Sequence, residues 1–267
     1  MIYVDRNVLS RLRSILRAPD AAQCVSDSWW LKHLDRPGVR FNPVLCGLEG
    51  NVRRTPSASE FSVAIDAAAT DLRAFFNSAE VLDYDHERQA ATYGILQALA
   101  HRRAAEGAFL HGAAPLVASR VRCGQERPIE DVIVAMAADS GLPAVSTPVL
   151  AVLSVLYEPH DGTEPRIGRG VVKPRSGYSP EDAYNTAADL QALEWLTIAS
   201  ALTGGDAALL TLDRSLLNFW IALDVDILSL DHVQLRWQIT PSRDLVPRLS
   251  EEERMALVAR LAARDAS

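Results

Sequence analysis

The sequence predicts an α/β fold in which a small parallel sheet is flanked by helices and carries a large all-helical insertion. Two stretches support this, MIYVDRNVL (1–9) and AALLTLDRSLL (207–217). Each places a short apolar strand before an Asp and a helical pattern. A third observation is that residues from about 55–157 show helical periodicity and no clear strand. These three observations fit a chain that forms the first part of a sheet, then a block of helices, and then a further strand of the same sheet.

The first strand places a carboxylate at the start of a helix. Ile2, Tyr3 and Val4 form an apolar, β-branched and aromatic run that is typical of a strand. The run stops at Asp5, after which apolar residues recur at helical spacing. Ligands of open α/β sheets bind beyond the carboxyl ends of the strands. Asp5 is therefore a candidate site residue, and so is Asp213, which follows the late strand.

A short helix is predicted in FNPVLCGLEGN (41–51). Asn42 is a natural N-cap and Pro43 suits the first helical position. Glu49 lies near the end of this apolar helix. A single Glu here would be interpreted as a solvated surface residue, but together with the two aspartates it becomes a third candidate.

The insertion is expected to contain four helices, and a polar segment at 158–178 follows it. The helices fall at about 61–76, 83–107, 129–141 and 143–157. The segment is rich in Gly and Pro and carries four basic residues with no acid among them: Arg166, Arg169, Lys173 and Arg175. As a flexible basic loop it would contact a phosphodiester backbone. The alternative, an exposed connector, has equal weight.

The helix predicted over 179–203 supplies a fourth acid. Ser179 caps it, Pro180 takes its first position and Asp182 is the capping-box partner. Asp189 lies seven residues after Asp182 on the same polar face, which Asn185 shares. Glu194 is five residues further on, so it is turned roughly 140° away around the helix. Asp189 is the preferred candidate and Glu194 the alternative.

The predicted organisation is one domain over 1–240 and a helical tail over 241–267. The domain core comprises 1–52 and 179–240, including a last strand, VDILSL (225–230). The tail contains an amphipathic helix, EEERMALVARLAARD (251–265), which would dock on the body or on a partner.

The composition narrows the class of protein. A hydrophobic content of 48% with 23% charged residues is ordinary for a globular chain and argues against disorder. No run approaches the length of a membrane span, and the early first strand leaves no room for a signal peptide. Three scattered cysteines without a CxxC pair indicate reduced thiols, so we expect a cytoplasmic protein. A net charge of −7 argues against a broad surface that coats nucleic acid, but it permits a local basic groove.

The candidate acids favour a divalent cation. Carboxylates gathered at one crevice repel each other unless a cation is present, and hard oxygen ligands select Mg²⁺ or Mn²⁺. Such a site can activate water and stabilise the oxygens of a phosphodiester. The sequence contains no GxGxxG, Walker P-loop, GxSxG or HExxH motif. An aspartyl-nucleophile phosphatase would need an Asp at position 7, where Asn7 stands.

The two Asp motifs resemble those of PIN domains, the nuclease fold of VapC-type toxins and related ribonucleases. VDRNVL looks like the family's opening, and LLTLDRSL is similar to its late strand with Thr-x-Asp. The likeness covers roughly 1–52 and 179–231. It implies that Asp5, Glu49, Asp189 and Asp213 are catalytic and metal-binding, and that Asn7 orients the site. The spacing of Glu194 to Asp213 fits the family better than that of Asp189.

The resemblance implies a metal-dependent endonuclease that hydrolyses phosphodiester bonds, most plausibly in single-stranded RNA, with Mg²⁺ or Mn²⁺ as cofactor. The basic segment would hold the RNA. The protein would act as a toxin or defence ribonuclease, and its partner would be an antitoxin or another regulatory protein. No membrane association is expected, and the oligomeric state is left open. The alternative is a catalytically inactive PIN-like scaffold that binds RNA or protein.

Overall fold

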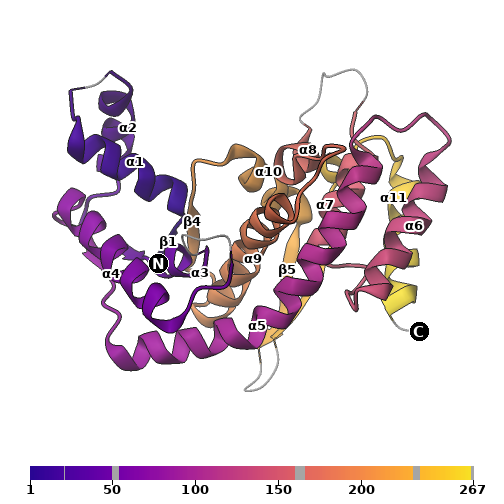
Figure 1. Ribbon diagram of the computed structural model, residues 1–267. Helices are drawn as coiled ribbons and strands as arrows, with labels where there is room; N and C mark the ends of the chain where they lie inside the picture. The colour runs from indigo at the N-terminus through magenta and orange to yellow at the C-terminus, as the bar shows by residue number, and fades with distance from the viewer. Residues whose placement is uncertain (21, 50–53, 160–165, 231–234, 266–267) are drawn as a thin grey trace. The chain divides into compact units, whose positions relative to one another are not determined.

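The structure, a computed structural model, describes residues 1–20, 22–49, 54–159, 166–230 and 235–265 (Figure 1). The chain forms two compact units, each built from two pieces of sequence. The first unit comprises Met1–Ala100 and Ile198–Asp213, and the second comprises His101–Thr197 and Arg214–Ser267. The boundary falls within α5 (His86–Ala113) and α9 (Pro180–Leu202), so both helices contribute to both units. Each unit is described separately below.

The first unit is built on a four-stranded parallel sheet with the order β3-β2-β1-β4. The strands are β1 (Ile2–Val4), β2 (Arg40–Asn42), β3 (Glu80–Val81) and β4 (Ala208–Leu210). Tyr3 lies opposite Asn42 on one side and Leu209 on the other. This confirms the predicted α/β class with a parallel sheet flanked by helices. Strands β2 and β3 were not predicted, because two or three residues are too few to show alternation.

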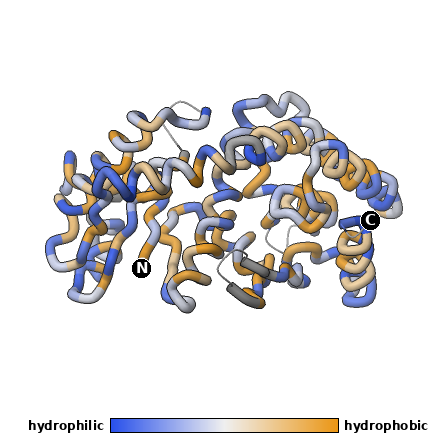
Figure 2. Tube along the Cα trace, turned by 90° about the horizontal axis from the view of Figure 1, so that it is seen from below, coloured by the Kyte–Doolittle hydropathy of each residue, from blue (hydrophilic) through white to orange (hydrophobic). Residues whose placement is uncertain are grey.

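Helices of the first unit pack around one apolar core. They are α1 (Arg6–Arg17), α2 (Ala22–Lys32), α3 (Val44–Glu49) and α4 (Ala58–Phe75). The core includes Val4, Leu12 and Leu72, which are all fully buried. Phe41 and Phe76 stack with their ring centroids 4.2 Å apart. The apolar first strand appears in orange beside the N label in Figure 2. Burial of this strand fixes the position of the residue that follows it.

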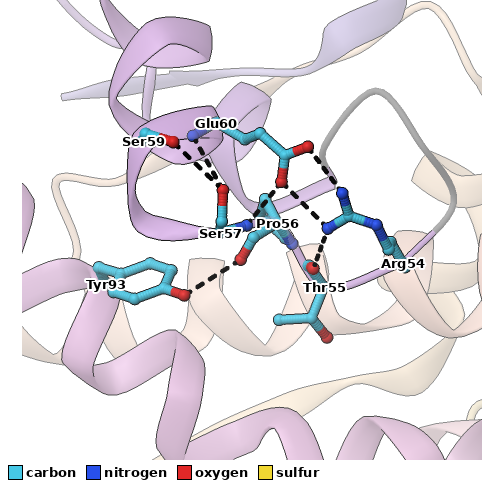
Figure 3. Close-up of polar contacts among 7 residues, drawn as sticks. All are labelled: Arg54, Thr55, Pro56, Ser57, Ser59, Glu60 and Tyr93. Carbon is cyan, nitrogen blue, oxygen red and sulfur yellow. Dashed lines mark hydrogen bonds and ion pairs between the residues drawn. The ribbon is translucent and has the colours of Figure 1, made fainter.

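Helix α4 begins at a complete capping box (Figure 3). The Ser57 hydroxyl accepts from the Glu60 amide at 3.3 Å, and the Glu60 carboxylate accepts from the Ser57 amide at 2.8 Å. Arg54 donates to both oxygens of Glu60, at 3.0 and 2.7 Å. The Ser57 amide and, after it, the Arg54 guanidinium lower the pKa of Glu60 to about 2. The polar stretch before α4 is therefore a structured helix start.

The second unit is mostly helical and contains one β-hairpin. Its helices besides the parts of α5 and α9 are α6 (Glu126–Asp139), α7 (Thr147–Leu156), α8 (Ile167–Val172), α10 (Arg214–Leu223) and α11 (Glu251–Asp265), with 3-10 turns at Ala114–Val117 and Arg243–Leu245. The hairpin pairs β5 (Val225–Leu230) with β6 (Leu235–Ile239) in antiparallel fashion. Every residue of α7 is buried, which makes this helix the centre of the unit.

Several sequence expectations need correction. The stretch from about 55–157 is not all helical, because β3 lies within it and pairs with β2. The polar segment at 158–178 is not a loop throughout, since it contains α8. The strand at 225–230 joins the hairpin and not the parallel sheet. Residues 241–265 belong to the second unit, with α11 as predicted. Among the described helices, none is long and apolar enough to cross a membrane.

Candidate functional site

The carboxyl ends of β1 and β4 bring two predicted site segments together. These strands are parallel neighbours, so the residues that follow them lie at the same edge of the sheet. The Asp5 amide extends the pairing by one step and donates to the Leu210 carbonyl oxygen at 3.0 Å. Asp5 therefore starts α1 directly beside the loop that contains Thr211 and Asp213.

Asp5, Asn7 and Thr211 form a closed hydrogen-bond network. Oδ2 of Asp5 accepts from Asn7 Nδ2 at 2.6 Å and from Thr211 Oγ1 at 2.5 Å. Asn7 Nδ2 and Thr211 Oγ1 are themselves 3.1 Å apart. Asp5 is only 9% exposed, yet its carboxylate has these partners in place. Asn7, for which an orienting role was predicted, thus donates to the Asp5 carboxylate, and Thr211 is a second donor to it.

The same network holds the backbone that leads to Asp213. The Leu212 amide donates to Asn7 Oδ1 at 2.9 Å, and the Asp213 amide donates to Thr211 Oγ1 at 3.0 Å. The structure thus places Asp5 and Asp213 at one edge of the first unit. Asp5 is also the N-cap of α1, with Oδ1 accepting from the Asn7 amide at 3.4 Å. Oδ1 of Asp5 thus caps α1, whereas Oδ2 takes part in the network with Asn7 and Thr211.

Next along the edge, beyond β2, lies a group of phenols that sequence reasoning missed. Asn42 Oδ1 accepts from the Val44 amide and from the Tyr84 hydroxyl, both at 3.0 Å. Burial raises the pKa of Tyr84 to about 12, and burial likewise raises that of Tyr3, which also bonds to Asn42. Both phenols therefore remain protonated near neutral pH. Tyr84 could not be linked to Asn42 from the sequence, because β3, which precedes it, was not predicted.

Glu49 and Asp189 are the two other acids of the predicted set. Glu49 is the last residue of α3, and its side chain lies outside the described residues. Asp189 is half-buried on α9 in the second unit. Burial is the main cause that raises the pKa of Tyr178, and the nearby Asp182 and Asp189 carboxylates add to it. The predicted capping box is present, with Ser179 and Asp182 bonded reciprocally at 2.9 and 3.1 Å.

Glu194, the alternative fourth acid, belongs to a buried ion cluster of the second unit. Arg102 donates to Glu194, and Thr147 Oγ1 donates to the same carboxylate at 3.1 Å. Arg102 Nε also lies 2.9 Å from Oε1 of Glu106, which is 1% exposed. Gln191 donates to the other Glu106 oxygen at 2.8 Å. Burial, followed by the charge of Glu194, raises the pKa of Glu106 to about 7, and burial raises that of Glu194.

Basic residues predicted to hold nucleic acid are engaged in protein contacts, Arg169 and Arg175 among them. Arg169 Nε bonds both oxygens of Glu158, at 2.9 and 2.8 Å. Its Nη atoms donate to backbone carbonyl oxygens of residues 117 and 118. Arg175 pairs with Asp182 at 2.5 Å, on the surface. Arg166 is exposed at the start of α8, and Lys173 ends that helix in the left-handed conformation with φ 51°.

The donor chemistry of the sheet edge suits a hard cation. Asp5 and Asp213 offer carboxylate oxygens, and Mg²⁺ is commonly held by one or two carboxylates, with water and substrate phosphates completing its shell. Within the part of the chain that the structure describes, no group of three or more His, Cys, Asp or Glu side chains could hold a metal ion. The described residues alone therefore supply at most a two-carboxylate site. No family model, curated protein or solved structure matches the chain.

Proposed function

We propose that the protein is a PIN-like, Mg²⁺- or Mn²⁺-dependent endoribonuclease. The observation that carries the proposal is the network of Asp5, Asn7 and Thr211 at the carboxyl edge of a parallel sheet, with Asp213 on the adjoining loop. A carboxylate oriented by an amide and a hydroxyl is preorganised, which is what a metal ligand or a catalytic group requires.

In this proposal each residue of the edge has a role of its own. Asp5 and Asp213 would hold the metal, which when bound supplies an activated water and stabilises the charge that develops on the phosphodiester. Asn7 and Thr211 position the Asp5 carboxylate by donating to Oδ2. Glu49 and Asp189 remain proposed members of the acid set on the sequence pattern.

The RNA would be held through the second unit. Arg166, Arg169, Lys173 and Arg175 remain the proposed contacts to the RNA backbone. Since Arg169 is bonded to Glu158 and to two carbonyl oxygens, the exposed Arg166 is the stronger candidate of the two. Phosphate contacts of this kind position a strand without reading its sequence.

A second candidate function has an observation in its favour. Oδ2 of Asp5 already accepts two hydrogen bonds, which satisfies the carboxylate without a cation. This arrangement also suits a PIN-like scaffold that binds RNA or protein and does not cleave. The two functions differ in whether RNA is cut when a divalent cation is supplied.

The test is an RNA cleavage assay with a matched control. Labelled single-stranded RNA is incubated with the full chain, with Mn²⁺, with Mg²⁺ or with a chelator. Asp5→Asn is the test variant. Asp35→Asn is the control, because Asp35 accepts backbone amides of residues 77–79, just before β3, and so serves structure at the opposite edge of the sheet.

We expect metal-dependent cleavage by the wild type and by Asp35→Asn, and at least a hundredfold loss with Asp5→Asn. That loss corresponds to about 2.7 kcal/mol of transition-state stabilisation. Equal cleavage by wild type and Asp5→Asn would reject the catalytic role. RNA binding without cleavage, by both proteins and with either metal, would favour the scaffold.

A further inference from the structure

A cavity of about 460 Å³ lies in the second unit, beside α6 and α11. Its lining includes three arginines from separate parts of the sequence: Arg127 on α6, Arg248 before α11, and Arg260 on α11. The ring of Tyr157 and the small side chain of Ala256 also face it. The volume falls within the range of small-molecule sites, so the cavity is large enough for a ligand.

A buried carboxylate holds two of these guanidinium groups in place. Glu130 is 2% exposed and accepts from Arg260 Nη2 at 3.0 and 3.2 Å and from the Tyr157 hydroxyl at 2.5 Å. Arg127 donates to the same carboxylate and lies 3.4 Å from exposed Asp131. One buried negative charge is therefore shared between two positive ones. This contact positions both arginines.

The third guanidinium is fixed on the other side of the cavity. Arg248 Nη2 pairs with Glu126 and reaches Sγ of Cys123 at 3.5 Å. Its side chain is 16% exposed, so it cannot turn freely into solvent. Arg248 Nη1 and Arg260 Nε are buried and have no hydrogen-bond partner among the described residues. Buried donors without an acceptor are unfavourable, and an unseen acceptor commonly explains them.

Carboxylates stand beside each of the three guanidiniums. Glu126 pairs with Arg248, Glu130 is shared by Arg127 and Arg260, and Asp131 lies near Arg127. The other lining acid, Glu253, is exposed and accepts from the amide and hydroxyl of Ser250, both at 2.8 Å. It caps α11 and does not face the arginines as a partner. What the cavity offers an anion is two partly dry donor atoms without a partner in the described part of the chain, Arg248 Nη1 and Arg260 Nε, which attract an anion more strongly than exposed donors would.

We propose that this cavity binds the phosphate group of a small organic phosphate such as a mononucleotide. A phosphate monoester offers three terminal oxygens, which can accept from several guanidiniums at once, whereas a carboxylate offers two. Tyr157 and Ala256 provide surface for the organic part. The cavity lies within the second unit and the sheet edge within the first, so this proposal stands independently of nuclease activity.

The test is isothermal titration calorimetry on the full chain at low ionic strength. The probes are adenosine 5′-monophosphate, inorganic phosphate and, as the phosphate-free control, adenosine. Arg260→Gln removes a lining guanidinium. Arg13→Gln is the matched control, since Arg13 is similarly exposed (42% against 39%) and also pairs with an acid, at 2.6 Å to Asp71. Circular dichroism checks that the variants are folded.

Ala256→Leu gives a second, uncharged variant. Ala256 lies at an exposed helical position that tolerates Leu well, and the larger side chain narrows the cavity. This variant therefore tests phosphate binding even if Arg260→Gln does not fold. We expect saturable binding of at least one phosphate probe, weakened roughly tenfold or more in Arg260→Gln and in Ala256→Leu, and unchanged in Arg13→Gln. Absence of binding by both phosphate probes would overturn the proposal. Equal binding of adenosine and its monophosphate, or unchanged binding in both cavity variants, would overturn it too.

Discussion

Replacing Glu106 by Gln should make the protein more stable at alkaline pH and leave its stability nearly unchanged in mild acid. Glu106 is buried beside Glu194, and the two carboxylates share Arg102. Burial and the Glu194 charge raise the pKa of Glu106 from 4.5 to about 7. An acid with a raised pKa in the folded state binds its proton more tightly there than in the unfolded chain. The folded state therefore loses stability as the pH rises from about 4.5 to about 7.

The size of the expected stability change follows from the shift in the pKa of Glu106. Each unit of pKa is worth about 1.4 kcal/mol, so ionisation of Glu106 costs the folded state up to roughly 3 kcal/mol above neutral pH. Gln carries no charge and can still accept from Gln191, whose amide is 2.8 Å from the carboxylate. The variant should thus match the wild type near pH 5 and exceed its free energy of unfolding at pH 8. Loss of the Arg102 contact reduces the gain, so we expect about 1–3 kcal/mol.

Urea unfolding at pH 5 and pH 8, followed by circular dichroism, measures this difference. The useful quantity is the change in free energy of unfolding between variant and wild type at each pH, because titrating groups that do not interact with Glu106 cancel. Glu252→Gln, on the exposed first turn of α11, is the control and should show no such pH dependence. An effect of Glu106→Gln that is the same at both pH values would refute the argument.

Three further substitutions, with Gly177→Ala as a control, test particular contacts. Gly168→Ala should destabilise the protein by about 1–3 kcal/mol in thermal unfolding, because a Cβ there would lie 2.7 Å from the Val155 amide nitrogen. Gly177→Ala, where a Cβ meets nothing within 4 Å, should be nearly neutral. Thr211→Val should cost about 1–3 kcal/mol, since it removes the hydroxyl that bonds Asp5 and accepts from the Asp213 amide. Ser57→Ala should cost about 1 kcal/mol through loss of the α4 cap (Figure 3).

Each of these stability predictions has an outcome that would contradict it. Equal melting temperatures for the two glycine variants would show that α7 and α8 are not closely packed. A Thr211→Val protein as stable as the wild type would show that the network at the sheet edge does not bear on folding. Retained stability in Ser57→Ala would mean that Arg54 and Glu60 hold the start of α4 without the hydroxyl.

Structural elements that are determined by neighbouring residues could be predicted from the sequence, and those that depend on contacts between distant residues could not. The last helix was expected at 251–265 and is observed as Glu251–Asp265, because its amphipathic period is complete. The start of α9 at Pro180 followed from a local capping box. Asp5 and Asp213 could be proposed from the sequence because each follows an apolar strand, and the two strands are parallel neighbours in the sheet.

The misses have identifiable causes. The predicted helix stopped at Gly107, yet α5 continues to Ala113, since Phe109, Leu110 and Ala113 are buried beyond the glycine. Helix α8 was hidden by two glycines in six residues. Gly168 is needed there because the helix approaches the α7 backbone too closely for any side chain. The ion cluster of Arg102, Glu106 and Glu194 joins residues far apart in sequence, so no local pattern reveals it.

The position of β4 in the sheet has a consequence for how the chain folds. Strand β1 is made first on the ribosome, whereas its neighbour β4 is made only after all of residues 101–197. Until then the free side of β1 is an unprotected strand edge, which can pair with another chain. Contacts of such long sequence separation also form slowly. A nascent or truncated chain that stops before residue 208 should therefore aggregate or engage chaperones, whereas one that loses only α11 should still complete its parallel sheet.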